Sequence, residues 1–283
     1  MKYRFFSLIT RSYTHVGQGA ADTGVIDNLI QREKPDGIPV MHASSIKGAF
    51  RSHCKEILGY NDDKLDLLFG TDDNSNVSTG TNRTIYQSML VFHDARLLFL
   101  PVGALYEKAT YYATSPNTLK RYFSMANKLL GRNDNHTLRL PAPGSNFCCY
   151  RKDNSDIPPD IEGISGSFLQ VEQDVLDSNV FCDLRTEEVA MFEEARFRDI
   201  CKYCIPVIER NCLDDDGVSK NKFNEEVLPY GTHLWFFISY PDALPPIWKQ
   251  WVDTFLADIQ NTYVQIGANF SLAQGLCEIQ ELK

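Results

Sequence analysis

The N-terminal segment 14–51 combines a glycine-rich loop, one isolated carboxylate and the basic start of a predicted helix. Exposed backbone amides, helix N-termini and cationic side chains are the groups with which proteins bind phosphate. A carboxylate placed among them, Asp27, could do chemistry on a phosphate-linked chain. The phosphate-binding candidates of this segment are Gly17, Gly19, Ser44, Ser45, Lys47 and Arg51.

If the phosphate-linked chain were RNA, one carboxylate would be sufficient in principle for its cleavage, because RNA supplies its own nucleophile. If the 2′-hydroxyl attacks the adjacent phosphorus, the 5′-oxygen leaves, and the protein needs only to orient the backbone and stabilise charge. Our hypothesis is that Asp27 binds a divalent metal ion, with Mg²⁺ as the expected ion, or accepts the proton. From the residues alone, a side chain that stabilises its own turn is the favoured interpretation of an isolated loop aspartate, and it is the family resemblance described below that favours the catalytic role.

The remaining polar candidates also allow more than one role. His15 could be an acid, a phosphate contact or a structural residue after the first strand. Lys47 and Arg51 are four residues apart and share a helix face, which suits RNA phosphates or a solvated basic surface. The C-terminal loop from Gly267 to Gly275 could cradle phosphate or could be a tight connection between strands.

Composition restricts the class of protein. The chain has 283 residues, of which 43% are apolar, so it can bury a sizeable core in one large or two small domains. Its net charge of -9 argues against a general nucleic-acid binder and confines any RNA contact to one groove. No run of about 18 apolar residues occurs, so we expect no membrane contact and a cytoplasmic protein. The Cys201-x-x-Cys204 spacing is a weak metal signal, and free thiols are the expected state of the eight cysteines.

Hydrophobic periodicity predicts an alternation of strands and helices. The helix after 43 is expected to have Ser44 or Ser45 as its N-cap. The order predicts an α+β fold with a ferredoxin-like (RRM-like) core, insertions at about 59–84 and 131–185, and one domain over 1–283. The first and last strands of that core can be neighbours, so the glycine loops 17–24 and 267–275 could meet. Strands are expected at 3–13, 89–92, 97–100, 234–238, 264–266 and 276–279, and helices at 46–58, 116–130, 187–203 and 245–260.

A β-hairpin is predicted over about 205–228. Two strand-like segments flank Asp214-Asp215-Asp216-Gly217, and an Asp-Gly pair favours a tight hairpin turn. The hairpin is long and polar enough to project from the body of the protein. We refer to it as the thumb.

At these positions the sequence resembles the RAMP superfamily of CRISPR proteins, and more narrowly the repeated backbone subunit of the type III-B (Cmr) effector complex. The resemblance is spread over most of the chain and is weak in the middle third. The block 24–51 is specific to this subunit type, whereas the terminal glycine loop alone marks the superfamily. The matching segments are 14–19, 24–27, 30–33, 44–51, 94–98, 225–229 and 267–275.

The resemblance implies a function in RNA-guided defence. Copies of the chain would stack head to tail along a guide RNA, beside other Cmr subunits, and the thumb would wedge into the duplex of guide and single-stranded target RNA. Asp27 would cut the target with a divalent metal ion, and Glu225 would be a supporting acid, although Glu225 and Glu226 could equally be solvated hairpin residues. The resemblance adds Lys222, Gly267, Asn269 and Gly275 to the expected RNA contacts.

The sequence departs from the family pattern at several positions. Val227 stands where an aromatic residue is frequent, and Ala268 and Ala273 stand where glycines are common. Asn28 and Leu29 also differ from the usual residues after the aspartate. Two other functions therefore remain open: a guide-binding scaffold subunit of the same filament without cutting activity, and a guide-processing nuclease, for which His15 is the one candidate residue.

Overall fold

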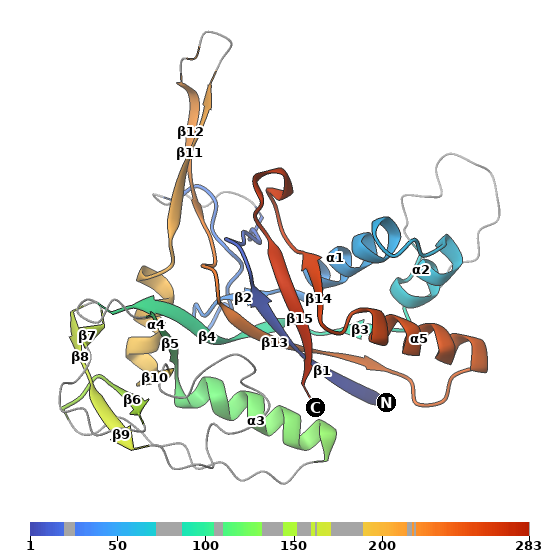
Figure 1. Ribbon diagram of the computed structural model, residues 1–283, viewed down its shortest axis with the longest axis horizontal. Coiled ribbons are helices and arrows are strands. Elements are labelled where there is room, and N and C mark those ends of the chain that lie inside the picture. Colours follow the sequence, from blue (N-terminus) through green and yellow to red (C-terminus); the bar gives the residue numbers. More distant parts are fainter. Residues whose placement is uncertain are drawn as a thin grey trace.

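A mixed β-sheet crosses the whole molecule in the computed structural model (Figure 1). The structure describes residues 1–19, 26–71, 87–104, 110–131, 144–151, 160–161, 163–170, 189–213, 217 and 219–282. Within these residues eleven strands join the sheet, in the order β14-β15-β1-β13-β4-β5-β10-β6-β9, with β2 on β4 and β3 on β13. The α+β class predicted from the sequence is confirmed.

The strands of the large sheet match most of the predicted ones. They are β1 Lys2–Thr10, β2 Val40–Met41, β3 Val91–Phe92, β4 Ala95–Gly103, β5 Thr110–Thr114, β6 Phe147–Arg151, β9 Ser167–Gln170, β10 Val189–Phe192, β13 His233–Tyr240, β14 Thr262–Gln265 and β15 Leu276–Leu282. A small separate pair is formed by β7 Asp160–Ile161 and β8 Ile164–Ser165.

Strand β1 is an interior strand of the sheet and pairs antiparallel with both β13 and β15. Its side chains alternate between two cores, because successive residues of a strand point to opposite faces. On one face Phe6 stacks on Phe236, and on the other Phe5 stacks on Trp235. The two ends of the chain therefore lie side by side in one sheet.

Helices cover both faces. α1, α2 and α5 pack on the face of Phe6, whereas α3 packs on the face of Phe5 through buried Leu119 and Tyr122. α3 begins at the N-cap Ser115 and ends at Gly131 in the left-handed conformation, and its bounds are the 116–130 that the sequence predicted. The helices are α1 Ala43–Glu56, α2 Asp62–Phe69, α3 Pro116–Leu130, α4 Glu194–Tyr203 and α5 Pro246–Asp258, with a 3₁₀ turn, η4, at Phe270–Leu272.

Three predictions of local structure were wrong. The first strand ends at Thr10 rather than at residue 13. The helix predicted for 187–203 starts only at Glu194, because the apolar run Val189–Phe192 is fully buried as β10, between β5 and β6. Residues 62–69, predicted as part of an insertion, form the helix α2, whose buried leucines belong to the core.

The predicted thumb is present. β11 Val207–Leu213 and β12 Ser219–Glu226 pair only with each other among the described strands and project from the body (Figure 1). Of the predicted turn, 214–216 lies outside the described residues. The same holds for 20–25 of the N-terminal loop, 72–86 of the first insertion and most of the second insertion. No helix in the described part of the chain is long and apolar enough to cross a bilayer.

Candidate functional site

Asp27 lies at the root of the thumb, on a segment that runs along strand β12. Asn28 forms a parallel bridge with Glu225, and backbone hydrogen bonds join Asn28 N to Asn224 O (3.1 Å) and Glu226 N to Asn28 O (2.9 Å). The Asp27 side chain is exposed, and its Oδ2 accepts a hydrogen bond from Asn224 N at 2.8 Å. Its Oδ1 has no hydrogen bond to any described residue, so one carboxylate oxygen is available at the surface.

Glu225, the predicted supporting acid, is buried and fully engaged. Its Oε2 lies 2.7 Å from Arg210 Nε and accepts a hydrogen bond from Asn269 at 3.1 Å. Its Oε1 lies 3.5 Å from Nε2 of His15. Arg210 and Asn269 also both donate to the side-chain oxygen of Gln274. We call these five residues the thumb latch, since they join the thumb to the N-terminal and C-terminal loops.

Glu226 makes a second connection below the latch. One carboxylate oxygen accepts from Arg32 at 2.9 Å, and the other accepts from the backbone N–H of Ile30 at 3.2 Å. Both glutamates are buried, which excludes the alternative that they are solvated hairpin residues. Of the three carboxylates at the thumb root, Asp27 is therefore the one that faces solvent. No group of three His, Cys, Asp or Glu side chains arranged to hold a metal ion occurs among the described residues.

His15 occupies a structural position between the two glutamates. Its Nδ1 lies 2.7 Å from the Glu226 carbonyl oxygen, and because a carbonyl only accepts, Nδ1 carries the proton. Nε2 then faces the Glu225 carboxylate, where a second proton would complete an ion pair. The ring is buried, which favours the structural role over an acid that contacts RNA.

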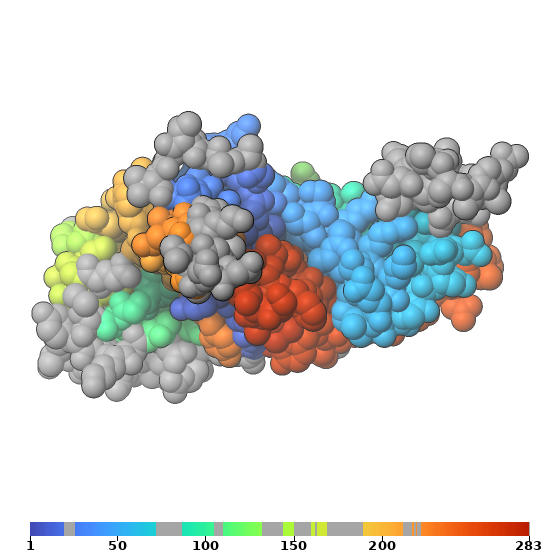
Figure 2. All heavy atoms as spheres, turned by 90° about the horizontal axis from the view of Figure 1, so that it is seen from above, coloured from blue at the N-terminus to red at the C-terminus, as the bar shows by residue number. Residues whose placement is uncertain are grey.

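The terminal glycine loop meets the segment 13–15, which leads directly into the predicted N-terminal glycine loop 17–24. Ala268 N donates to His15 O at 2.9 Å, and Gly275 N donates to Tyr13 O at 2.8 Å. A Cβ at Gly267 would lie 2.1 Å from His15 O, so only glycine fits at this crossing. Figure 2, which looks down on the thumb, shows the orange thumb bordered by the blue N-terminal segment and the red terminal loop.

The terminal loop contains two non-glycine residues in the left-handed region. Asn269 has φ 67° and Ala273 has φ 55°. Asparagine tolerates this conformation, whereas alanine is strained in it. Ala273 therefore adopts a left-handed backbone conformation that a glycine would adopt without strain.

Several predicted RNA contacts line one groove beside helix α1. Gly17, Ser44, Ser45 and Gly267 border this hollow of about 620 Å³. The side chain of Gln31 ties its walls together, because Nε2 donates to Gly17 O and to Ser45 Oγ while Oε1 accepts from His42 N.

The start of α1 differs from the prediction. His42 is the N-cap and makes no side-chain cap hydrogen bond, so Ser44 and Ser45 are not caps but lie in the first turn. The first free amide, Ala43 N, instead donates to Asp94 Oδ1 at 2.8 Å. A carboxylate from a distant segment replaces the local cap, which leaves the serine hydroxyls at the groove.

The predicted cations are only partly available. Arg51 donates to Asp66 Oδ1 and to the Leu65 and Gly70 carbonyl oxygens, so its guanidinium holds α2. Lys47 is half-buried, and burial, with Arg51 nearby, lowers the pKa of its ammonium group.

The two remaining predicted contacts on the thumb side are exposed. Lys222 forms an ion pair with Glu209 across the thumb at 2.8 Å. Gly19 has φ 105° and is the last described residue before 20–25.

The prediction of free thiols is confirmed for six of the eight cysteines. Cys201 and Cys204, at the end of α4, are free thiols. The other free thiols, elsewhere in the fold, are Cys54, Cys148, Cys149 and Cys277. Burial raises the pKa of the Cys201 thiol, so it stays protonated at neutral pH and is a poor metal ligand.

Val227, one of the positions at which the sequence departs from the expected family pattern, is fully buried and its N–H donates to Pro206 O. It anchors the thumb strand and does not reach the surface near Asp27.

Sequence reasoning missed Arg210, Arg32 and Gln31. The register of the thumb pairs Ile208 with Glu225 and Arg210 with Phe223, so Arg210 and Glu225 are diagonal neighbours. Counting back from the predicted Asp-Gly turn could have revealed this pair. Arg32 and Gln31 carry no such local signal, because their partners lie on distant segments.

Comparisons with known proteins agree with this arrangement. A model of the RAMP superfamily matches residues 7–277. The CRISPR system Cmr endoribonuclease Cmr4 of Pyrococcus furiosus is 26% identical over 295 residues, which cover 99% of this chain and 95% of that protein. The crystal structure of oligomeric Cmr4 from Pyrococcus furiosus superposes with a TM-score of 0.75 at 20% identity, covering 100% of this chain and 98% of that one.

A second solved structure is similar at comparable coverage. In the cryo-EM structure of the type III-B Cmr-beta complex bound to cognate target RNA, one chain has a TM-score of 0.76 at 17% identity, covering 100% of this chain and 98% of that one. At such identities the likeness establishes the fold.

Proposed function

This chain belongs to the RAMP superfamily, and from that premise we propose that it is a backbone subunit of an RNA-guided type III-B CRISPR complex that binds guide RNA and cleaves complementary target RNA. Cmr4 of Pyrococcus furiosus, to which this chain is 26% identical, is named as an endoribonuclease of the Cmr system. The observation that carries the proposal is the position of Asp27, an exposed carboxylate fixed by backbone hydrogen bonds at the thumb root.

The proposed reaction uses the 2′-hydroxyl of the target RNA as nucleophile. The 2′-oxygen forms a bond to the adjacent phosphorus, and the bond from phosphorus to the 5′-oxygen breaks. The products are a 2′,3′-cyclic phosphate and a 5′-hydroxyl. The proton of the 2′-hydroxyl goes to Asp27 Oδ1, directly or through one water molecule, and the leaving oxygen takes a proton from water.

Asp27 is also suited to be the protein ligand of a divalent cation. Mg²⁺ keeps several water ligands and commonly binds through one or two carboxylates together with substrate phosphates. When bound, it would supply positive charge at the phosphoryl oxygens. Glu225 and Glu226 do not fit as further ligands, because both are buried. Glu225 Oε2 is held by Arg210 and Asn269 and its Oε1 faces buried His15, while the two Glu226 oxygens accept from Arg32 and Ile30.

We assign the guide RNA to the groove beside α1. Gly17, Ser44, Ser45 and Gly267 offer hydroxyl and backbone groups there, which contact phosphates without reading sequence. Several copies in a head-to-tail filament would extend this groove, which suits a chain whose net charge of -9 opposes RNA elsewhere. Target choice would then belong to base pairing with the guide.

The order of strands and helices supports a ferredoxin-like core within a single domain. Four strands with the order β15-β1-β13-β4, all antiparallel, are interleaved with α1 and α5 in the sequence order of a ferredoxin-like core. We propose that this core is the palm of one domain over 1–283, with the segment from β5 to β12 inserted into it.

We place the complex in the cytoplasm, where free thiols persist.

Changing Asp27 to Ala or Asn in the complex assembled with guide RNA tests the function. We expect unchanged assembly and target binding, with cleavage reduced roughly 10²- to 10⁴-fold, the usual contribution of a positioned base. Asp253→Ala is the matched control, because Asp253 is an exposed aspartate of α5. Persistent cutting by the Asp27→Ala complex would refute the role of Asp27.

The scaffold function is the alternative, and it predicts target binding without cutting by the unaltered complex. Guide processing has no support from the structure, because its one candidate residue, His15, is buried.

A further inference from the structure

Among the described residues that line the groove beside α1, none is a lysine or an arginine. Arg51 is committed to α2, and Asp94 already occupies the first free amide of α1. The ionisable side chains on the walls are His53 and Glu56. Burial lowers the pKa of His53, so its ring is largely uncharged at neutral pH, and a carboxylate opposes an anion. Neutral hydrogen-bond donors must therefore hold a phosphate in this groove.

The orientation of the Gln31 side-chain amide is set by the backbone of residue 42. Gln31 is buried on the wall of the groove. His42 N lies 2.6 Å from Gln31 Oε1, and because a backbone N–H can only donate, the group that faces it is the amide oxygen. The amide nitrogen of Gln31 therefore points the other way and has two hydrogens to donate.

These two hydrogens go to Gly17 O at 3.1 Å and to Ser45 Oγ at 3.0 Å. Ser45 Oγ thus accepts a hydrogen bond from Gln31, and it donates to no residue in the part of the chain that the structure describes. A serine hydroxyl can accept as well as donate, but it has one hydrogen. With Gln31 on its accepting side, that hydrogen is directed away from Gln31 and toward the groove that Ser45 lines.

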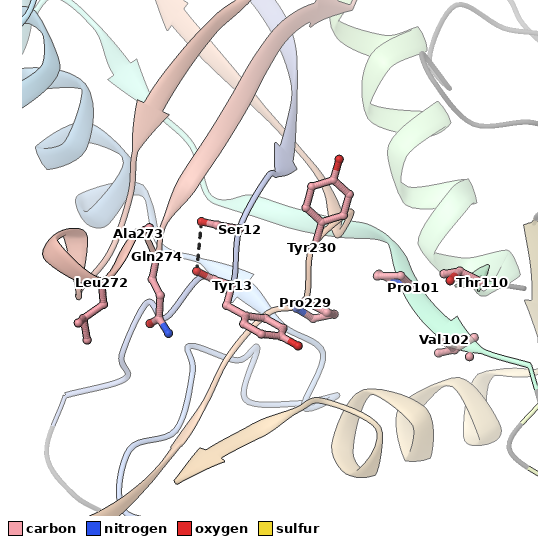
Figure 3. Close-up of a pocket in the computed structure, with 11 residues that line it drawn as sticks. Ser12, Tyr13, Pro101, Val102, Thr110, Pro229, Tyr230, Leu272, Ala273 and Gln274 are labelled. Atoms are coloured by element: carbon pink, nitrogen blue, oxygen red, sulfur yellow. Dashed lines mark hydrogen bonds between the residues drawn. The ribbon is translucent and has the colours of Figure 1, made fainter. Parts of the chain in front are cut away.

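A second hollow that borders the terminal loop has the opposite arrangement. Its volume is about 570 Å³, similar to that of the groove, and no charged side chain among the described residues lines it. Ser12 Oγ, on its wall, accepts from Leu276 N at 2.9 Å and donates to Tyr13 O at 3.4 Å, the dashed line in Figure 3. The one hydrogen of Ser12 is used within the protein, so this serine has no donor left for a phosphate.

We infer that Gln31 is a positioning residue for guide binding: it fixes the hydroxyl of Ser45 as a hydrogen-bond donor to a phosphate oxygen of the guide RNA. The inference rests on the proposed function, because it needs the guide in this groove. The oxygens of a phosphodiester only accept hydrogen bonds, so a donor that is fixed before binding favours phosphate at this position. Gln31 acts through Ser45, and orienting the hydroxyl in advance lowers the cost of ordering it when RNA binds.

Guide affinity of two variants at position 31 tests the inference without relying on cleavage. Labelled guide RNA is titrated with the full-length chain in the presence of the other subunits of the complex. Gln31→Glu still accepts from His42 N but presents an acceptor to Ser45, so the serine hydrogen turns away from the groove. We expect its guide Kd to rise roughly 10- to 150-fold, the loss of one hydrogen bond to a charged group. Gln31→Met leaves the hydroxyl free to rotate, and its guide Kd should lie between those of Gln31→Glu and the unaltered chain.

The order of these two variants separates the positioning role from a merely structural one. If Gln31 only joined the walls of the groove, Gln31→Met would weaken binding more, because it leaves His42 N and Gly17 O without their partner, whereas Gln31→Glu keeps the bond to His42 N. The same variants in a Ser45→Ala chain give a second readout. With the hydroxyl removed, the two should bind the guide equally within about twofold. A remaining defect of Gln31→Glu in that chain would assign the effect to charge repulsion and would overturn the inference.

Ser45→Ala alone keeps the test decisive if a variant at position 31 fails to fold, which urea unfolding of each free chain shows. It should raise the guide Kd by the same roughly 10- to 150-fold. Ser12→Ala is the matched control and should leave the guide Kd unchanged. If the unaltered chain binds no guide, the proposed function fails and the inference fails with it. If the unaltered chain binds the guide and Ser45→Ala binds it as tightly, the positioning role is wrong and the function stands.

Discussion

The thumb latch should contribute more to stability than any exposed ion pair of this protein. The Glu225 and Arg210 side chains are only 6% and 15% exposed, with Nε and Oε2 2.7 Å apart. Removal of one partner from a buried pair leaves an uncompensated charge and typically costs 3–5 kcal/mol. Because Asn269 and His15 still contact Glu225, we expect the lower end, about 3 kcal/mol, for Arg210→Ala.

The double variant Arg210→Met/Glu225→Leu sharpens this expectation. Replacing both partners of a buried pair by apolar residues of similar volume is often neutral, so the double variant should be more stable than Arg210→Ala alone. Urea unfolding gives the midpoint, and an unchanged m-value shows that the change is one of stability. A difference of about 3 kcal/mol corresponds to a change of roughly 150-fold in the unfolding equilibrium constant.

The exposed pair on the same hairpin is the matched control. Lys222 and Glu209 are 59% and 60% exposed, and exposed pairs contribute about 0–1 kcal/mol. Lys222→Ala should therefore change the free energy of unfolding by less than about 1 kcal/mol. The reasoning is refuted if Arg210→Ala behaves like Lys222→Ala, or if the double variant is less stable than Arg210→Ala.

Three further predictions concern the terminal loop and α1. Gly267→Ala should destabilise by about 3 kcal/mol or more, because its Cβ would lie 2.1 Å from His15 O at φ 90°, and urea unfolding measures this loss. Ala273→Gly should stabilise by about 1 kcal/mol, because it relieves a left-handed alanine, and the melting temperature should rise. Burial lowers the pKa of His53, so the unfolded state binds more protons and stability should fall as pH drops below about 6.5. His53→Leu should reduce this acid-side loss, measured as urea midpoints at about pH 5 and about pH 8.

Each of these predictions has a contradicting result. A Gly267→Ala chain as stable as the unaltered one would mean that the terminal loop does not cross the segment 13–15 as described. A lower melting temperature of Ala273→Gly would place the alanine methyl in a favourable contact. An unchanged pH dependence in His53→Leu would assign the acid-side loss to other groups.

Much of the site could be predicted because its signals are local. The glycines, Asp27 and the Asp-Gly turn of the thumb mark loops by backbone preference alone. Pro116 and Gly131 marked both ends of α3 for the same reason. The approach of the terminal loop to the N-terminal segment followed from the position of the first and last strands, which long apolar alternation identified.

Other features depended on partners far away in the chain. Val189–Phe192 is an apolar run that is compatible with a helix or a strand. It forms a strand because it pairs with β5 on one side and with β6 on the other. Ser44 and Ser45 have good capping side chains, but Asp94 took that role from another segment. Glu225 looks like a surface residue until Arg210 and Asn269 enclose it.

By itself the sequence determined the superfamily, the α+β class and the one acidic residue on which the proposed chemistry depends, because backbone preference and hydrophobic period are encoded locally. Only the tertiary structure decided which of the three thumb-root carboxylates stays free. Asp27 remains at the surface, whereas Glu225 and Glu226 are neutralised by cations and amides brought from elsewhere in the chain. A buried charge must be paired, and that pairing is a property of the folded chain rather than of any segment.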